Sequence, residues 1–209
     1  MSDGPPLRYL ALGDSYTIGE GVAAGESWPA QLAHALRTRG IAVAEPVVIA
    51  QTGWTTDELQ AAIDAAALEP PYYLVSLLVG VNNQYRGRGL EEYRGQFERL
   101  LLQAISLANG RREHVLVLSI PDWGVTPFAL TEKDRTPAEI GHAVDAFNVA
   151  AFDVCARHGV AFLDITPISR ECGAYPAMLV DDGLHPSAAM YALWARQALA
   201  VVHAMVRAQ

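Results

Sequence analysis

The apolar residues of this 209-residue chain fall into two alternating patterns. Short continuous apolar runs are typical of buried strands. Between them lie longer segments in which apolar residues recur every three or four positions, the spacing of one helix face. The runs predict strands at residues 7–12, 41–43 with 47–50, 72–79, 114–120 and 160–163. Strands that alternate with helices favour a parallel sheet covered by helices on both faces, which is a three-layer α/β/α fold with five strands.

Proline, glycine and capping residues mark the helix boundaries. Pro29 suits the first turn of a helix and Gly40 suits its end, while Thr55 and Glu58 have the spacing of a capping box. The expected helices span residues 28–40, 55–68, 90–108 and 137–159, with a last helix from residue 186. Residues 121–136 and 164–184 show no clear period and are expected to be long loops. Since no linker or repeat interrupts this order, we expect a single domain over residues 1–209.

The composition narrows the class of protein. The net charge is −8 with no basic run, so a nucleic-acid partner is not expected. No apolar run approaches about 18 residues, which argues against a membrane-spanning helix, and residues 1–6 show no signal peptide, so a cytoplasmic location is expected. Cys155 and Cys172 are expected to be free thiols, and neither has metal-ligand spacing. We expect no metal and no cofactor.

Chemically useful residues follow several of the predicted strands. Ser15 comes just after the first strand, Gly53 after the second and Asn82 after the third, and Asp182 and His185 precede the last helix. Groups beyond the carboxyl ends of parallel strands face the crevice where α/β proteins bind ligands. These residues are therefore expected to converge at one edge of the sheet.

The residue types match the needs of nucleophilic catalysis. A serine hydroxyl such as that of Ser15 requires an adjacent base, which His185 can supply near neutral pH. Asp182, three residues earlier, can bond one ring nitrogen and direct the other toward the serine. The backbone N–H groups of Ser15 and Gly53 and the side-chain amide of Asn82 are candidate donors to an oxyanion.

These segments resemble the SGNH, or GDSL-type, esterases and lipases. The resemblance depends on Gly13-Asp14-Ser15-Tyr16-Thr17, Gly53, Gly80-Val81-Asn82-Asn83 and Asp182-Gly183-Leu184-His185-Pro186. The four blocks have the family's order and span nearly the whole chain. The resemblance implies a flavodoxin-like fold and hydrolysis of small-molecule carboxylic esters. It also implies a catalytic Ser15, His185 and Asp182, and an oxyanion hole of Ser15, Gly53 and Asn82.

Some features leave alternatives open. Many family members have aspartate where this chain has Asn83, so whatever that aspartate supports locally is carried here by a neutral amide. An α/β-hydrolase elbow is disfavoured because Thr17 replaces its second glycine. A nucleotide- or flavin-binding module, or an inactive esterase-like protein, remains the alternative. Acetyl esters, lysophospholipids and acyl thioesters are all candidate substrates.

Four further side chains carry expectations of their own. Asp14 is expected to bond nearby backbone and fix the turn at the serine. Trp123, Phe128 and Tyr175 lie in the two long loops, where they either line a substrate pocket or anchor the loops to the core.

Overall fold

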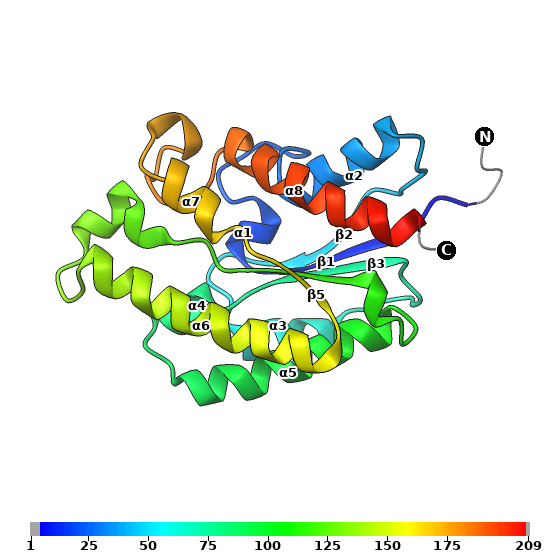
Figure 1. Ribbon diagram of the computed structural model, residues 1–209, viewed down its shortest axis with the longest axis horizontal. Helices are drawn as coiled ribbons and strands as arrows, with labels where there is room; N and C mark the ends of the chain where they lie inside the picture. Colours follow the sequence, from blue (N-terminus) through cyan, green and yellow to red (C-terminus); the bar gives the residue numbers. More distant parts are fainter. Residues whose placement is uncertain (1–4, 208–209) are drawn as a thin grey trace.

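A five-stranded parallel sheet forms the centre of the molecule (Figure 1), which the computed structural model describes over residues 5–207. The strand order is β2-β1-β3-β4-β5, and every neighbouring pair is parallel. The strands are β1 (Tyr9–Gly13), β2 (Val47–Ala50), β3 (Leu74–Leu78), β4 (Val115–Leu118) and β5 (Ala161–Leu163). The predicted three-layer α/β fold with a flavodoxin-like strand order is confirmed. Of residues 1–6, considered above for a signal peptide, residues 1–4 lie outside the described part.

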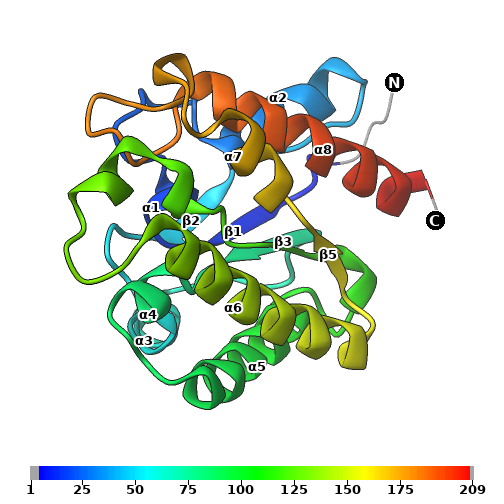
Figure 2. The same ribbon diagram turned by 60° about the vertical axis from the view of Figure 1, so that its left-hand side comes forward.

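Helices cover both faces of this sheet. One layer contains α2 (Trp28–Thr38) and α8 (Ala188–Arg207), and the other contains α3 (Thr56–Ala65), α5 (Leu90–Leu107) and α6 (Pro137–His158) (Figures 1 and 2). This division follows from right-handed crossovers, because the chain moves from β1 to β2 in one direction and from β2 to β5 in the other. The two layers bury the sheet, so that every residue of β1 and β3 is buried.

The predicted end signals set several helix boundaries. Thr136 and Glu139 form a capping box at the start of α6, and Gly159 ends that helix in the left-handed conformation. Thr55 and Glu58 form the capping box predicted for α3. That helix ends at Ala65 and not near residue 68, because the backbone becomes extended at Ala66.

Three further predictions were wrong because pairing between segments decides the local structure there. Strand β1 begins two residues later than predicted and includes Gly13, which is paired with Ala50 on one side and Leu78 on the other. Residues 41–43 are not a strand; only Val43 forms a bridge, with Leu7. Helix α8 begins at residue 188 because Pro186 is held in a bridge to Leu179.

The two expected long loops contain short helices. Residues 121–136 include η2 (Trp123–Val125) and η3 (Pro127–Thr131), and residues 164–184 include α7 (Thr166–Cys172) and η4 (Pro176–Met178). Cys172 therefore lies at the end of a helix and not in a loop. Both cysteines are free, and Cys155 is buried.

The direction in which successive strands join the sheet reverses at β1, which lies between β2 and β3. The connection after β1 crosses one face of the sheet and the connection after β3 crosses the other, so a crevice opens between the carboxyl ends of these two neighbouring strands. Two short helices, α1 (Ser15–Ile18) and α4 (Val81–Tyr85), begin directly at those ends. The fold thereby brings Ser15 and Asn82 to the same edge of the sheet.

Candidate active site

Ser15 is the first residue of α1, immediately beyond β1. The turn that presents it depends on Gly13, because a Cβ atom there would overlap the Leu78 carbonyl oxygen and the Thr17 side chain. Asp14 caps the short helix by accepting a hydrogen bond from the Tyr16 N–H, at 3.1 Å. The expectation that Asp14 fixes this turn is confirmed.

Asp14 is fully buried and is an unusual acid. Its Oδ2 atom has no hydrogen-bond partner within the described part of the chain. Burial raises the pKa of the Asp14 carboxyl to about 7, although hydrogen bonds from the backbone of Tyr16 and Gly80 oppose the shift. The group directly behind Ser15 therefore changes charge near neutral pH.

Asp182 and His185 form a tight pair in the loop before α8. Asp182 Oδ2 lies 2.6 Å from His185 Nδ1, and Asp182 Oδ1 accepts hydrogen bonds from the backbone N–H groups of Leu184 and His185. Burial raises the pKa of Asp182, but the hydrogen bonds from the His185 ring and from the two N–H groups outweigh it and leave that pKa below its usual value. An ionised carboxylate only accepts hydrogen bonds, so Nδ1 carries the proton and Nε2 is free to act as a base. The neighbouring Asp181 is exposed and lies outside this pair.

The loop after β2 is fastened to the helix after β3. Asn82 donates from Nδ2 to the Trp54 carbonyl at 2.9 Å, and Arg86 donates from Nη2 to the Gly53 carbonyl at 2.6 Å. Gly53 has a φ of +87°, a conformation that glycine adopts without strain. No hydrogen bond within residues 5–207 uses the N–H of Ser15 or of Gly53. Both N–H groups are therefore free to bind a ligand.

Asn83, the departure from the family pattern, is fully buried behind this loop. It accepts a hydrogen bond from the Thr56 N–H at 3.1 Å and donates to Thr56 Oγ1 at 2.7 Å. The Thr56 hydroxyl is in turn bonded to Gln96. A neutral amide is suited to this position because it both accepts and donates, and it ties α4 to the first turn of α3.

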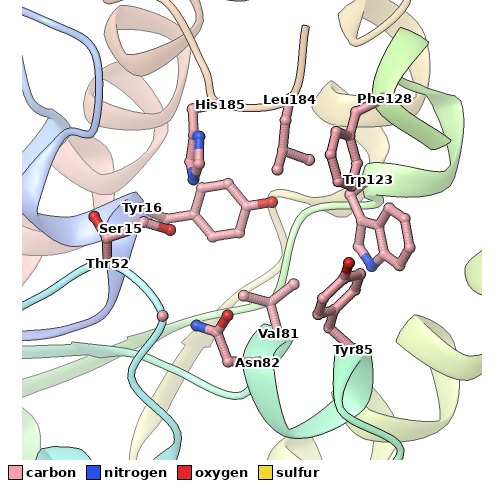
Figure 3. A pocket seen from close by; sticks show the side chains of 11 residues that line it. Ser15, Tyr16, Thr52, Val81, Asn82, Tyr85, Trp123, Phe128, Leu184 and His185 are labelled. Atoms are coloured by element: carbon pink, nitrogen blue, oxygen red, sulfur yellow. The ribbon is translucent and has the colours of Figure 1, made fainter. Parts of the chain in front are cut away.

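Ser15, Gly53, Asn82 and His185 all line one cavity of about 200 Å³. In Figure 3 the imidazole of His185 extends toward the side of the cavity where Ser15 lies, and Asn82 lies on the opposite wall. The remaining lining is mostly apolar or aromatic and comprises Tyr16, Thr52, Val81, Tyr85, Trp123, Phe128 and Leu184. The structure thus brings the predicted site residues to one apolar cavity, with Asp182 behind His185.

The cavity wall from the 121–136 segment is anchored on both sides. Trp123 donates from Nε1 to Gln84 Oε1 at 2.8 Å, in helix α4. The Phe128 N–H donates to the Gly183 carbonyl at 3.1 Å, in the loop that carries the imidazole. Trp123 and Phe128 therefore both line the pocket and fasten the segment, whereas Tyr175 is 60% exposed and is not part of the lining.

The described part of the chain lacks two features that would indicate other kinds of protein. Among residues 5–207, no group of three His, Cys, Asp or Glu side chains is placed to hold a metal ion. No helix in the same part of the chain is both long and apolar enough to span a membrane.

Comparison with known proteins gives the family. The chain matches the GDSL-like lipase/acylhydrolase family over residues 11–193 and therefore belongs to it. As a member of that family it is a carboxylic ester hydrolase. The resemblance expected from the four motif blocks is confirmed. The comparison with curated proteins gave no match.

Solved structures share the fold over almost the full chain. TesA is 20% identical, with a TM-score of 0.74 over 95% of this chain and 99% of TesA. A lipase/acylhydrolase from Enterococcus faecalis is 20% identical, with a TM-score of 0.69 and 96% of each chain covered. The acetylxylan esterase Axe2 from Geobacillus stearothermophilus is 21% identical, with a TM-score of 0.72 over 97% of this chain and 96% of that one. At these identities the likeness concerns the fold.

Sequence reasoning missed the residues that support and surround the motif blocks. Arg86, which bonds the Gly53 carbonyl, lies outside any motif, and only its position one helical turn after Asn82 hints at a role. Tyr85 and Thr52 line the cavity without a sequence signal. Tyr16 belongs to the first motif block, but the sequence alone assigns it no role in the cavity.

Proposed function

We propose that the protein hydrolyses esters through an acyl-enzyme on Ser15. His185 is the base, Asp182 orients it, and the N–H groups of Ser15 and Gly53 with the Asn82 amide form the oxyanion hole. The observation that carries the proposal is the 2.6 Å bond between Asp182 and the Nδ1 atom of His185, a residue that lines the same cavity as Ser15. It leaves Nε2 as the basic atom on the cavity side.

The reaction follows from these roles. His185 removes the Ser15 proton as the hydroxyl oxygen attacks the ester carbonyl. The three donors stabilise the negative oxygen of the tetrahedral intermediate. His185 then returns the proton to the leaving alcohol or thiol, and water repeats the sequence to release the acid. The free N–H groups of Ser15 and Gly53 support this assignment, since they lack partners among the described residues.

The cavity favours small esters with an apolar moiety. Its volume of about 200 Å³ is below the roughly 300–1,000 Å³ common for drug-sized ligands. Short acyl esters, including acetyl esters, fit this size better than lysophospholipids or long-chain thioesters. No cofactor takes part in the proposed reaction.

Labelling with a fluorophosphonate probe tests the nucleophile. The wild-type protein is expected to react and Ser15→Ala is expected to lose both the label and the hydrolysis of p-nitrophenyl butyrate, with its thermal unfolding unchanged. Ser27→Ala is the matched control, because Ser27 begins a helix without a side-chain cap bond, and it should label normally. Wild-type turnover by Ser15→Ala would refute the proposed role of Ser15.

A further inference from the structure

Tyr16 places a phenol inside the apolar cavity, next to the proposed nucleophile. Tyr16 is only 3% exposed, and its ring centroid lies 5.8 Å from that of His185. In Figure 3 the ring crosses the cavity between His185 and Val81, and the hydroxyl points away from Ser15 toward the far wall. That wall consists mainly of Leu184, Trp123 and Tyr85.

The other polar groups of the cavity wall are already engaged. The Thr52 hydroxyl bonds the Glu20 carboxylate, and the Tyr85 hydroxyl donates to Glu132 at 3.3 Å. The indole N–H of Trp123 donates to Gln84, as described above. Together with the groups of the proposed reaction centre, these bonds account for every polar side chain that lines the cavity except Tyr16.

The Tyr16 hydroxyl forms no hydrogen bond with any residue between 5 and 207. Burial, with the nearby charges of Asp14, Asp182 and Asp122, raises the pKa of this phenol above its ordinary value, so it stays protonated. It is thus a neutral group able to donate one hydrogen bond and to accept another. The hydroxyl oxygen is not one of the fully buried side-chain atoms that lack a partner, so it is accessible from the cavity, where a bound molecule can pair with it.

We propose that the Tyr16 hydroxyl binds an oxygen atom within the substrate's otherwise apolar moiety. The preferred substrates are then esters whose acyl or alcohol chain carries an ether, hydroxyl or carbonyl oxygen beyond the ester group, rather than plain alkyl esters. This inference rests on the proposed function, since it places the ester carbonyl at Ser15 and the chain beside Tyr16. The aromatic and aliphatic wall receives the rest of the chain, and the phenol recognises the oxygen.

A competing explanation also makes a testable prediction. Tyr16, Trp123 and Leu184 border a second cavity of about 20 Å³, whose lining includes Trp194 with a buried, unpaired indole N–H. A space of that size holds about one water molecule. If the hydroxyl serves only such a water, it does not distinguish substrates.

Paired substrates and Tyr16→Phe separate these explanations. In the acyl arm, p-nitrophenyl hexanoate is compared with p-nitrophenyl 3-ethoxypropanoate and 4-methoxybutanoate, in which oxygen replaces one methylene. In the alcohol arm, butyl acetate is compared with 2-methoxyethyl acetate. The kcat/KM ratio of the oxygen ester to its alkyl partner should fall by about three- to tenfold in Tyr16→Phe for at least one pair, the usual worth of one neutral hydrogen bond. Differences in the intrinsic reactivity of the two esters cancel, because the ratio for the same pair is compared between the wild type and Tyr16→Phe.

Tyr85→Phe is the matched control, because it removes a hydroxyl from the same wall whose partner is Glu132. Its substrate ratios should equal those of the wild type. Ratios that change by less than twofold in Tyr16→Phe in both arms would overturn the inference. Calorimetry of the same esters with Ser15→Ala and with Ser15→Ala/Tyr16→Phe measures their binding affinities without turnover. If the wild-type protein hydrolysed none of the esters and the binding preference were still lost with Tyr16, the inference would stand and the proposed function would be refuted.

Discussion

Asp182→Asn separates orientation of the base from simple packing. In the native loop, Oδ1 of Asp182 accepts two backbone N–H groups, from Leu184 and His185, and Oδ2 accepts the ring Nδ1–H at 2.6 Å. Asparagine keeps its single oxygen on the two N–H groups, so its NH₂ group must face Nδ1. Nδ1 then becomes an acceptor, and the proton moves to Nε2, the atom required to take the proton from Ser15.

The expected loss in kcat is about 10⁴-fold, equal to about 5 kcal/mol, as for the same change in a Ser-His-Asp triad. Steady-state hydrolysis of p-nitrophenyl butyrate measures it, with urea unfolding as a check that the loop is intact. Asp181→Asn is the control, because it removes the same charge from the adjacent exposed residue and should keep wild-type turnover. A loss below tenfold in Asp182→Asn, or an equal loss in both variants, would contradict the assignment.

Three further predictions concern groups around the proposed oxyanion hole and the turn. Asn82→Ala should lower kcat by roughly 10²–10³-fold, the usual cost of one oxyanion donor; a loss below threefold would exclude that role. Arg86→Ala should lower kcat by roughly three- to tenfold with KM unchanged, because the Gly53 carbonyl loses its 2.6 Å partner, and Arg86→Lys should recover part of it. The pKa of Asp14 is about 7 in the folded protein and near 4 in the unfolded chain. Between about pH 4 and 7, only the folded state therefore keeps the carboxyl protonated. The free energy of unfolding falls as the pH rises from about 4 to 7. Asp14→Asn should remove that fall in urea midpoints at pH 5 and 8; an identical fall in both proteins would contradict the shift.

The periodicity of apolar residues and the helix-end signals predicted most of the fold. The strands and long helices were predictable because their apolar patterns match the burial that the layers require. The errors lie where distant segments decide local structure. Gly13 belongs to β1 because Ala50 and Leu78 pair with it, and Pro186 stays outside α8 because Leu179 holds it in a bridge. None of these three partners can be inferred from the local sequence.

The candidate site was predictable to the extent that its residues occupy motif blocks. Ser15, Asn82 and His185 stand at strand ends or before a helix, so topology alone brings them toward one edge. The cavity wall could not be predicted, since the short helices around Trp123 and Phe128 have too few residues to show a period. The same holds for the contact of Arg86 with the Gly53 carbonyl, which depends on how two connections pack.

The anchoring of the 121–136 segment at both ends has a consequence for how this protein diversifies. The groups assigned to bond cleavage arise from other parts of the chain, whereas Trp123 and Phe128 arise from this segment alone. We expect that exchanging the segment, while preserving the attachments at Gln84 and Gly183, changes which molecules are accepted and leaves the proposed reaction centre in place. This part of the cavity wall is therefore separable from the proposed reaction centre, whereas Tyr16 is not, and directed evolution of the segment is a direct route to new substrates.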